Sequence, residues 1–431
     1  MEQLLHYCWK HKIFPLRELK TTDGRSFEVL NPGLHNTDAG PDFLDAKVKI
    51  DGIVWVGNVE IHVRASDWHR HRHDGNPAYE NIILHVVGVE DEKLSYYNGQ
   101  AVPQFVLTVP RYVADNYDHL LLADKQPPCK DVLADFPRLL IHSWLASLQV
   151  ERLEMRTQQI MERHARLQWN WEDTSFVTVA RAFGFGKNGD AFERWASSIP
   201  AVAVGKHRDN LMQVEAIFFG QAGFLEEFFT DADEYYLRLQ REYKFLRQKF
   251  SLTPMDAHRW KFLRLRPQNF PHVRIAQLAM LYHEGRLNFS RLLQADTAEE
   301  MKDLLQTHVS DYWRTHYHFH SAQTPAGDKL LSDASLELLL INAVSPVLFS
   351  YARYKSDETL AEHALRLLES LKPETNSVVR CWAEAGVQAE NAADTQAILQ
   401  LHTAYCLRRD CLRCRFGFEY IRRTPDFLRE T

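Results

Sequence analysis

The chain lacks the features of a membrane or secreted protein. It has no long uninterrupted apolar run, since its most apolar stretch, Leu336 to Phe349, is broken by Glu337, Asn342 and Pro346. Such a stretch predicts a buried core helix and not a membrane span. The first fourteen residues carry charge and histidine where a secretory leader would be apolar. We therefore expect a cytoplasmic protein.

The chain also has few cysteines and a small net charge. Six cysteines among 431 residues, with no visible secretory leader, argue against a disulfide framework. The net charge is only −6, so the chain as a whole is not a polycation, and any site for a polyanion must be a local patch. A length of 431 residues exceeds what one hydrophobic core usually supports, which predicts at least two domains.

Two kinds of pattern divide the chain. Short runs rich in β-branched residues at 27–30, 45–50, 53–63 and 81–89 predict strands, with a hairpin at Asp51-Gly52. The pattern changes after Gln126-Pro127-Pro128, and from about Pro137 apolar residues recur at helical spacing to about residue 423. The sequence thus predicts an α+β fold. A small mixed β-sheet domain with flanking helices spans residues 1–125, and a larger all-α domain with a cysteine-rich end spans 126–431.

The hairpin from 40 to 63 carries the most informative polar residues. Asp42 begins its first strand, and period-2 alternation places Glu60 and His62 on one face of the second. Two facing carboxylates repel by about 4 kcal/mol at a separation of roughly 4 Å and an effective dielectric near 20. A cation between them relieves this repulsion, and oxygen ligands suit Mg²⁺ or Mn²⁺.

The strand register decides which acid faces Glu60. A two-residue loop at Asp51-Gly52 puts Asp42 opposite Ile61 and leaves Asp45 to share the face of Glu60. A three-residue loop with Gly52 in the left-handed conformation brings Asp42 opposite Glu60. The two-residue register buries the cleaner apolar face, so both acids remain candidate ligands.

These residues carry a resemblance to a known superfamily. Pro41-Asp42, followed after a short hairpin by Glu60-Ile61-His62, resembles the motif of the PD-(D/E)XK nucleases. The resemblance implies a restriction-endonuclease-like mixed sheet flanked by helices, with carboxylates that bind Mg²⁺ and activate water for phosphodiester cleavage. It implies catalytic roles for Asp42, Glu60 and His62, and Glu2 matches an acidic residue often found on the first helix. His62 departs from the motif, which usually has lysine there.

A second resemblance covers most of the chain. The strings SDWHRHRHDGNPAYENIILHVV at 66–87 and RPQNFPHVRIAQLA at 266–279 resemble an uncharacterised bacterial family, domain of unknown function 2851. This resemblance implies no activity. It implies only that these segments belong to one kind of protein.

Histidines cluster around the acidic hairpin. Five of the 21 fall within 24 residues, namely His62, His69, His71, His73 and His85. Alternate histidines on an extended segment can point one way, so His71, His73 and His85 are candidate metal ligands that would favour Mn²⁺, Fe or Zn²⁺. The alternative is a solvated basic loop, with His85 hydrogen-bonded inside a strand.

A basic stretch at 238–274 is a candidate surface for nucleic acid. It holds ten lysines and arginines against two acids, with aromatic residues among them. Such a surface would track phosphates and stack bases. The candidate binding residues are Arg241, Lys244, Arg247, Arg264, Arg266 and Arg274. The alternative is an ordinary solvated helix face whose aromatics belong to the core.

Three cysteines near the C-terminus have the close spacing of a metal knuckle. Cys406, Cys411 and Cys414, with His402 one turn earlier, could hold a structural Zn²⁺. Cys381 is another candidate fourth ligand, and an iron–sulfur cluster lacks a clear fourth cysteine. The alternative is a set of reduced, packed thiols. Neighbouring arginines would lower the thiol pKa values in either case.

Together these patterns predict a metal-dependent nuclease that hydrolyses phosphodiester bonds of DNA or RNA. In this hypothesis Asp42 and Glu60 hold the metal, with Asp45 as a rival ligand, and His62 acts as proton shuttle, charge partner or extra ligand. A first alternative is a protein that binds nucleic acid as a scaffold and has lost its chemistry at position 62. A second is a hydrolase for another phosphate ester.

Overall fold

The computed structural model describes residues 1–16, 18–36, 38–95, 101–124, 126–227, 229–230 and 232–423. The chain forms two compact units. The first combines residues 1–136 with the chain from His402 onward, and the second holds 137–401. The predicted boundary at residue 125 lies outside the described residues. The C-terminal segment was expected in the helical domain but belongs to the first unit.

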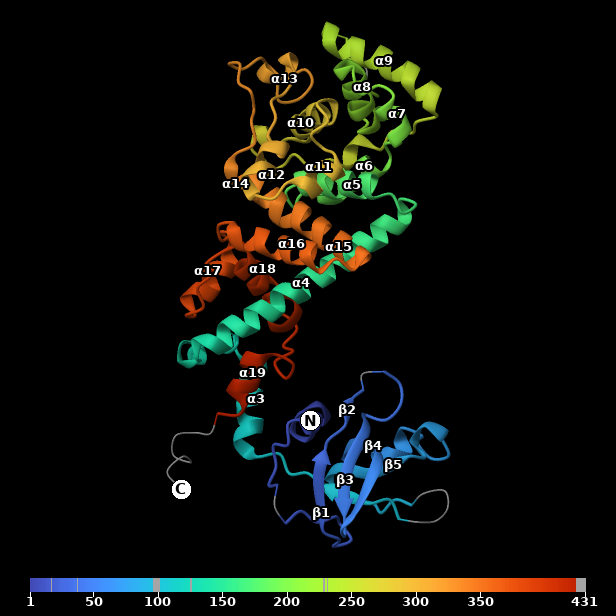
Figure 1. The fold of residues 1–431 in the computed structure, drawn as a ribbon, viewed down its shortest axis with the longest axis vertical. Helices are drawn as coiled ribbons and strands as arrows, with labels where there is room; N and C mark the ends of the chain where they lie inside the picture. Colours follow the sequence, from blue (N-terminus) through green and yellow to red (C-terminus); the bar gives the residue numbers. More distant parts are fainter. Residues whose placement is uncertain are drawn as a thin grey trace. The chain divides into compact units, whose positions relative to one another are not determined.

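The first unit is built on a six-stranded mixed sheet (strands in blue and cyan in Figure 1). Its strand order is β1-β3-β4-β5-β6, with β2 paired to β3. β1, β3 and β4 pair antiparallel, whereas β4, β5 and β6 run parallel. The strands are β1 (Phe27–Asn31), β2 (Leu34–His35), β3 (Phe43–Ile50), β4 (Ile53–Arg64), β5 (Ile82–Val89) and β6 (Gln104–Val106). The predicted α+β class and the four predicted strands are confirmed.

The β3–β4 hairpin turns where the sequence predicts. Ile50 pairs with Ile53, and Asp51 and Gly52 between them have φ values of 45° and 85°. Positive φ at both loop positions matches the right-handed twist of the strands, and Asp-Gly is a favoured pair for such a turn. The two-residue loop is therefore confirmed at this end of the hairpin.

Helices cover the sheet of the first unit. Leu4, Leu5, Cys8 and Trp9 are buried on one side of α1, and a Cβ added at Gly88 would contact Leu5. Period-2 alternation places His85 on the opposite face of β5 from Gly88, and there Trp68 of α2 contacts the His85 ring. The helices are α1 (Glu2–Lys10), α2 (Asp67–Arg70), η1 (Pro77–Tyr79), α3 (Arg111–Leu122), η2 (Lys130–Asp135) and α19 (Arg415–Ile421).

The C-terminal helix α19 is hydrogen-bonded to α3. The Asn116 side-chain amide donates hydrogen bonds to the carbonyl oxygens of Tyr420, Ile421 and Arg423, at 3.0–3.3 Å. These carbonyls lie at the helix end, where no intrahelical partner is available to them. The amide therefore acts as a C-terminal cap supplied from a distant part of the sequence.

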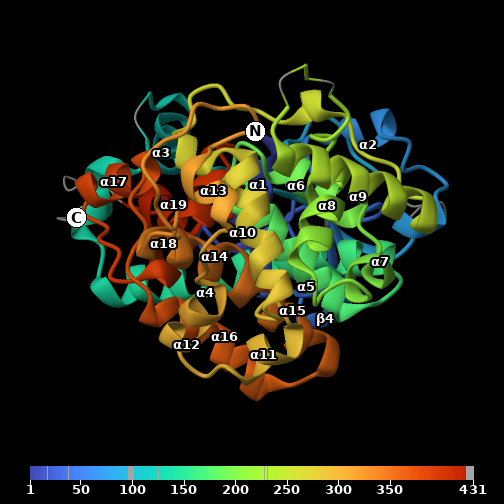
Figure 2. The same ribbon diagram turned by 90° about the horizontal axis from the view of Figure 1, so that it is seen from above.

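The second unit is all helical, as predicted, and many of its helices begin at asparagine, aspartate or serine caps. Figure 2 shows several of its helices from above. They are α4 (Arg138–Arg166), α5 (Trp171–Phe183), α6 (Gly189–Ser197), α7 (Ala201–Gly205), α8 (Leu211–Gln221), α9 (Glu234–Phe250), η3 (Ala257–Arg259), η4 (Pro267–Asn269), α10 (Pro271–His283), α11 (Phe289–Gln294), α12 (Ala298–Leu305), α13 (Asp311–Thr315), α14 (Asp333–Leu339), η5 (Leu340–Val344), α15 (Ser345–Lys355), α16 (Glu358–Ser370), α17 (Ser377–Glu384) and α18 (Ala392–Gln400). The π-helix η6 (Leu401–Cys406) lies at the boundary between the units.

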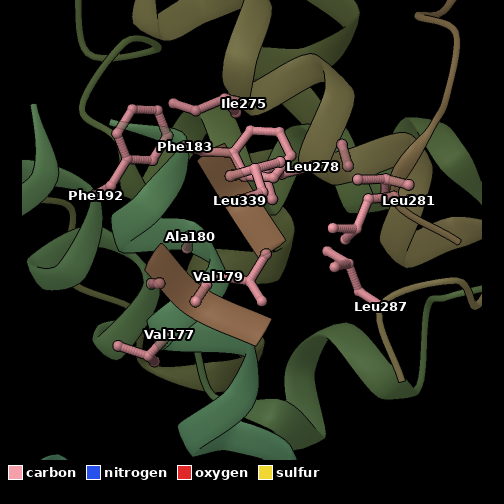
Figure 3. Packing of buried hydrophobic residues seen from close by; sticks show 14 of the residues in the cluster. Val177, Val179, Ala180, Phe183, Phe192, Ile275, Leu278, Leu281, Leu287 and Leu339 are labelled. Carbon is pink, nitrogen blue, oxygen red and sulfur yellow. The ribbon is translucent and has the colours of Figure 1, made fainter. Parts of the chain in front are cut away.

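One large apolar core holds the second unit together. In Figure 3, Phe183 of α5, Phe192 of α6, Ile275 and Leu278 of α10 and Leu339 of α14 belong to one buried cluster. The segment Asp333–Lys355 is long and apolar enough to cross a membrane, yet most of it is buried in this unit. Leu336 to Phe349 is thus part of a core helix, as its interruptions by polar residues and proline predict.

Candidate metal centre

Asp42 and Glu60 lie side by side because the β3–β4 hairpin changes register. Near the turn Ala46 pairs with Gly57, but further along Phe43 pairs with Val59. The β-bulge between these pairs inserts one extra residue into β3. Asp42 therefore lies opposite Glu60 even though the loop has two residues. The sequence patterns suggested two exclusive registers. Residues 46–50 follow the register of the two-residue loop, and Phe43 and the preceding Asp42 follow the other.

The two acids are tied together through the backbone. The Asp42 N–H donates to Glu60 Oε2 at 3.1 Å, and the Ile61 N–H donates to Asp42 Oδ2 at 2.9 Å. Asp45 lies in the bulge with φ 55° and is exposed. The Asp45 N–H donates to Asn58 Oδ1 at 3.3 Å. Of the two rival acids, the structure brings Asp42 to Glu60.

Three histidines gather beside Glu60. Ligand nitrogens of His62, His71 and His73 lie within 4.8 Å of one another. Nε2 of His62 is 3.1 Å from Nδ1 of His71. Nε2 of His73 lies 3.1 Å from Glu60 Oε1, in a geometry that makes no hydrogen bond, and Nε2 of His62 lies 3.6 Å from the same oxygen. Three imidazoles and a carboxylate thus surround one small volume.

His85 lies behind His62 rather than among the candidate ligands. It is fully buried, and its Nε2 is 2.8 Å from Nδ1 of His62, while its Nδ1 is 3.3 Å from Nε2 of Gln104. If the Gln104 amide is turned so that its oxygen accepts from His85 Nδ1–H, then His85 Nε2 accepts from His62 Nδ1–H. His62 Nε2 then keeps a lone pair for a cation, as in histidine ligands oriented by a second hydrogen bond.

Burial and the neighbouring imidazoles keep His62, His73 and His85 neutral. Burial, with the neighbouring His85, lowers the pKa of His62 to about 3, and burial with His73 lowers the pKa of His85 to about 3. Burial also lowers the pKa of His73. Neutral imidazoles are the form that binds metal.

The two carboxyl groups have opposite electrostatic character. Burial, together with the charge of Asp42, raises the pKa of Glu60 to about 9. Burial would also raise the pKa of Asp42, but the neighbouring His6 and the hydrogen bond from the Ile61 N–H lower it below its usual range. Such a divided pair is typical of functional sites. A divalent cation held by the imidazoles would favour the ionised form of Glu60.

Aromatic rings line the site. Tyr79 stacks on His73 with ring centroids 3.9 Å apart, and Trp68 contacts the rings of His62 and His73. Burial and the nearby Glu60 raise the pKa of Tyr79 to about 12. Tyr79 is thus a neutral packing partner that fixes the orientation of His73.

The segment 69–73 (HRHRH) has some histidines in the site and one in solvent. His71 and His73 reach the cluster, but His69 pairs with Asp74 at 2.5 Å and with Glu92 at 3.4 Å. The His69 side chain is 47% exposed. The solvated-loop alternative therefore describes His69 but not His73, which is 8% exposed.

Sequence reasoning missed His6 and Gln104. His6 Nε2 on α1 lies 3.3 Å from Asp42 Oδ2. Glu2, one helical turn before His6, is close enough to raise the pKa of Glu60. The i, i+4 spacing of Glu2 and His6 on one helix face was a usable signal. No sequence signal pointed to Gln104, because its contact with His85 depends on the parallel pairing of β5 and β6.

Only some of the basic residues in the stretch 238–274 are exposed at the surface. Arg241, Lys244 and Arg247 are exposed on α9, and Arg264 and Arg266 are exposed in the following segment. Arg247 pairs with Glu226 at 3.1 Å. The prediction that Arg274 belongs to a nucleic-acid-binding surface is wrong. It is 5% exposed on α10, and its guanidinium donates hydrogen bonds to Gln277 and Asn269. Tyr243 and Trp260 are also buried, whereas Phe245 is 58% exposed.

The C-terminal cysteines meet a fourth cysteine that the sequence patterns did not indicate. Cys129, Cys406, Cys411 and Cys414 all belong to the first unit and are each 6–7% exposed. Cys381 lies in α17 of the second unit. Burial lowers the pKa of His402.

The predicted lowering of the thiol pKa values is wrong. Burial raises the pKa of Cys411 to about 12 and raises the pKa values of Cys129 and Cys406 further. The Arg409 charge acts in the opposite direction but is outweighed. Desolvation of a thiolate thus exceeds the attraction of neighbouring guanidinium groups.

The fold and the site define a two-unit α+β protein whose mixed sheet carries a histidine–carboxylate cluster. Residues 2–377 match the family described as protein of unknown function (DUF2851), and the chain belongs to that family. No curated protein and no solved structure matches the chain significantly.

Proposed function

We propose that the protein is a metal-dependent nuclease that hydrolyses phosphodiester bonds of DNA or RNA. The observation that carries this proposal is the convergence of His62, His71 and His73 on Glu60, with Asp42 alongside. A mixed sheet flanked by helices also agrees with what the PD-(D/E)XK resemblance implies.

The donor set modifies the expected metal. Three imidazoles and a carboxylate suit Mn²⁺, Fe²⁺ or Zn²⁺ better than Mg²⁺, which prefers oxygen ligands and water. Of the two ions expected from the carboxylates, we therefore propose Mn²⁺, with Zn²⁺ and Fe²⁺ as competitors. His62, His71, His73 and Glu60 would hold the ion. Once bound, such an ion lowers the pKa of a water ligand and offsets charge on a phosphate.

The remaining residues would handle the proton and the orientation. Asp42 stays ionised, with His6 Nε2 3.3 Å from its Oδ2, and can accept a proton from attacking water. His85 and Gln104 hold the His62 ring in place. His62 is therefore proposed as a ligand and not as a substitute for the lysine of the motif.

The test uses the full chain, stripped with chelator and reloaded with Mn²⁺, Zn²⁺ or Mg²⁺, on labelled single- and double-stranded DNA and RNA. Glu60→Gln and Asp42→Asn should lower metal-dependent cleavage by about 10²–10⁴-fold. Asp45→Asn, which changes an exposed acid on β3, is the matched control. Absence of cleavage by the unmodified chain with every metal and substrate would overturn the proposal.

A binding protein without catalysis is the second candidate. His62 is 1% exposed and neutral, so it cannot supply the fixed positive charge of a lysine near a scissile phosphate. In that case the chain would bind metal and would bind nucleic acid with strong salt dependence, yet leave it intact.

A further inference from the structure

Four buried cysteines from two distant parts of the chain meet in the first unit. Cys129 precedes η2, Cys406 ends η6, Cys411 lies in the following turn, and Cys414 precedes α19. Cys129, Cys411 and Cys414 all lie close enough to Cys406 to contribute to the raised pKa of its thiol, and Cys411 and Cys414 do the same for Cys129. None of the four forms a disulfide.

The backbone around the cysteines is folded into tight turns. The Arg409 N–H donates to the Cys406 carbonyl at 3.2 Å, and the Cys414 N–H donates to the Cys411 carbonyl at 3.3 Å. Arg409 itself adopts a left-handed φ of 54°. Two successive turns of this kind keep Cys406, Cys411 and Cys414 close to one another along the folded backbone.

The turn that contains Cys411 and Cys414 packs closely against α19. A Cβ added at Gly417 would come 2.0 Å from the Cys411 carbonyl oxygen, so only glycine permits this approach. The Phe418 N–H donates to the Cys414 carbonyl at 2.8 Å. The Arg409 guanidinium donates to the carbonyls of Leu120 and Ala123 at the end of α3. The turn that carries Cys411 and Cys414 is therefore held by both α19 and the end of α3.

We propose that Cys129, Cys406, Cys411 and Cys414 are the ligands of a thiolate-bound metal centre, an iron–sulfur cluster. Cys129 supplies the fourth ligand, which local sequence spacing could not identify. The proposal concerns a site separate from the histidine–carboxylate cluster and does not depend on the proposed nuclease activity.

The spacing of the sulfurs favours a cluster over a single ion. A tetrahedral Zn²⁺ with Zn–S bonds of about 2.3 Å holds its sulfurs roughly 3.8 Å apart. Among the described residues, the group with all ligand atoms within 4.8 Å is the three histidines and not these thiols. An iron–sulfur cluster places several iron and sulfide ions between its cysteines and so accommodates wider spacing.

Such a centre would fasten the C-terminal segment to the N-terminal domain. Phe418 of α19 contacts the rings of Tyr7 and His11, and α1 also carries His6, which faces Asp42. A cross-link between Cys129 and Cys406 closes a very long loop, which lowers the entropy of the unfolded chain. The cluster would thus stabilise the unit that holds the candidate metal centre.

The test is metal and sulfide analysis of the full chain purified without oxygen. We expect about four iron and four acid-labile sulfide per chain, as for a [4Fe–4S] cluster, with visible charge-transfer absorbance. Cys129→Ser and Cys411→Ser should each remove this signal. Cys381→Ser and His402→Ala are the controls and should keep it. Circular dichroism shows whether each variant has folded.

A second measurement on the unmodified chain does not depend on the folding of variants. Alkylation with mass spectrometry should show the four thiols protected until the metal is removed and reactive afterwards. Stoichiometric zinc without sulfide, lost in the same variants, would overturn the cluster and replace it with a zinc site. No metal in the anaerobic protein, or protection unchanged by metal removal, would overturn the centre altogether.

Discussion

At the scale of single residues, the orientation of His62 is the most sensitive feature of the candidate metal centre. Its Nδ1 faces His85, and His85 in turn faces Gln104, so one amide sets which nitrogen of His62 keeps a lone pair. Gln104→Leu should weaken Mn²⁺ or Zn²⁺ binding by about 10–100-fold in calorimetry, whereas Gln104→Glu, which only accepts, should retain it. Equal loss in both variants would contradict this chain of hydrogen bonds.

The raised pKa of Glu60 predicts a pH dependence of stability in the metal-free protein. The native state binds the Glu60 proton more tightly than the unfolded chain, with a pKa of about 9 against 4.5. This contribution is fully present below pH 4.5 and is lost as pH rises towards 9.

Thermal unfolding in chelator between pH 6.5 and 9 measures the effect, because the depressed pKa values of His62 and His85 act only at lower pH. The unmodified chain should lose stability across this range, and Glu60→Gln should lose less. Parallel curves for the two proteins would show that Glu60 titrates normally.

At the scale of secondary-structure elements, the β3 bulge decides the geometry of the acids. Asp45 occupies it with φ 55°, a region that costs most residues about 1–2 kcal/mol and β-branched residues more. Asp45→Val should therefore lower the free energy of unfolding by about 1–2 kcal/mol, while Asp45→Gly should not lower it. Urea denaturation of both variants checks this prediction, and equal stability would mean that the bulge relaxes freely.

At the scale of the whole molecule, the second unit offers exposed cations for a polyanion. Arg241 and Lys244 lie on the solvent side of α9. An Arg241→Gln/Lys244→Gln double variant should weaken nucleic-acid binding and reduce the slope of log affinity against log salt by about 2. Arg314→Gln, an exposed arginine paired with Asp328 in the same unit, is the control. A slope unchanged in the double variant would remove α9 from the surface.

Metal binding should also be visible as stability of the intact chain. A ligand that binds only the native state adds about 2.7 kcal/mol when its concentration is 100 times its Kd. Chelation followed by Mn²⁺ titration should raise the melting temperature progressively. His71→Ala should abolish the rise and His69→Ala should keep it, since His69 pairs with Asp74 outside the cluster. A response equal in both variants would place the ion elsewhere.

Local sequence determined much of the fold. Alternating β-branched residues, the Asp51-Gly52 turn and helical periodicity after residue 137 each depend on short-range backbone preferences. The four predicted strands and the helices of the second unit lie where these preferences predict, whereas the short strands β2 and β6 were not predicted. Glu60 and His62 were placed on one face by strand geometry alone, because side chains alternate with a fixed period of two.

Only tertiary structure decided the sites. The bulge that brings Asp42 to Glu60, the separation of His69 from His71 and His73, and the burial of Arg274 depend on packing between elements. Gln104 reaches His85 through parallel strand pairing, and Cys129 reaches Cys406 through the return of the C-terminal segment. Such contacts join residues far apart in the chain, and no local spacing encodes them.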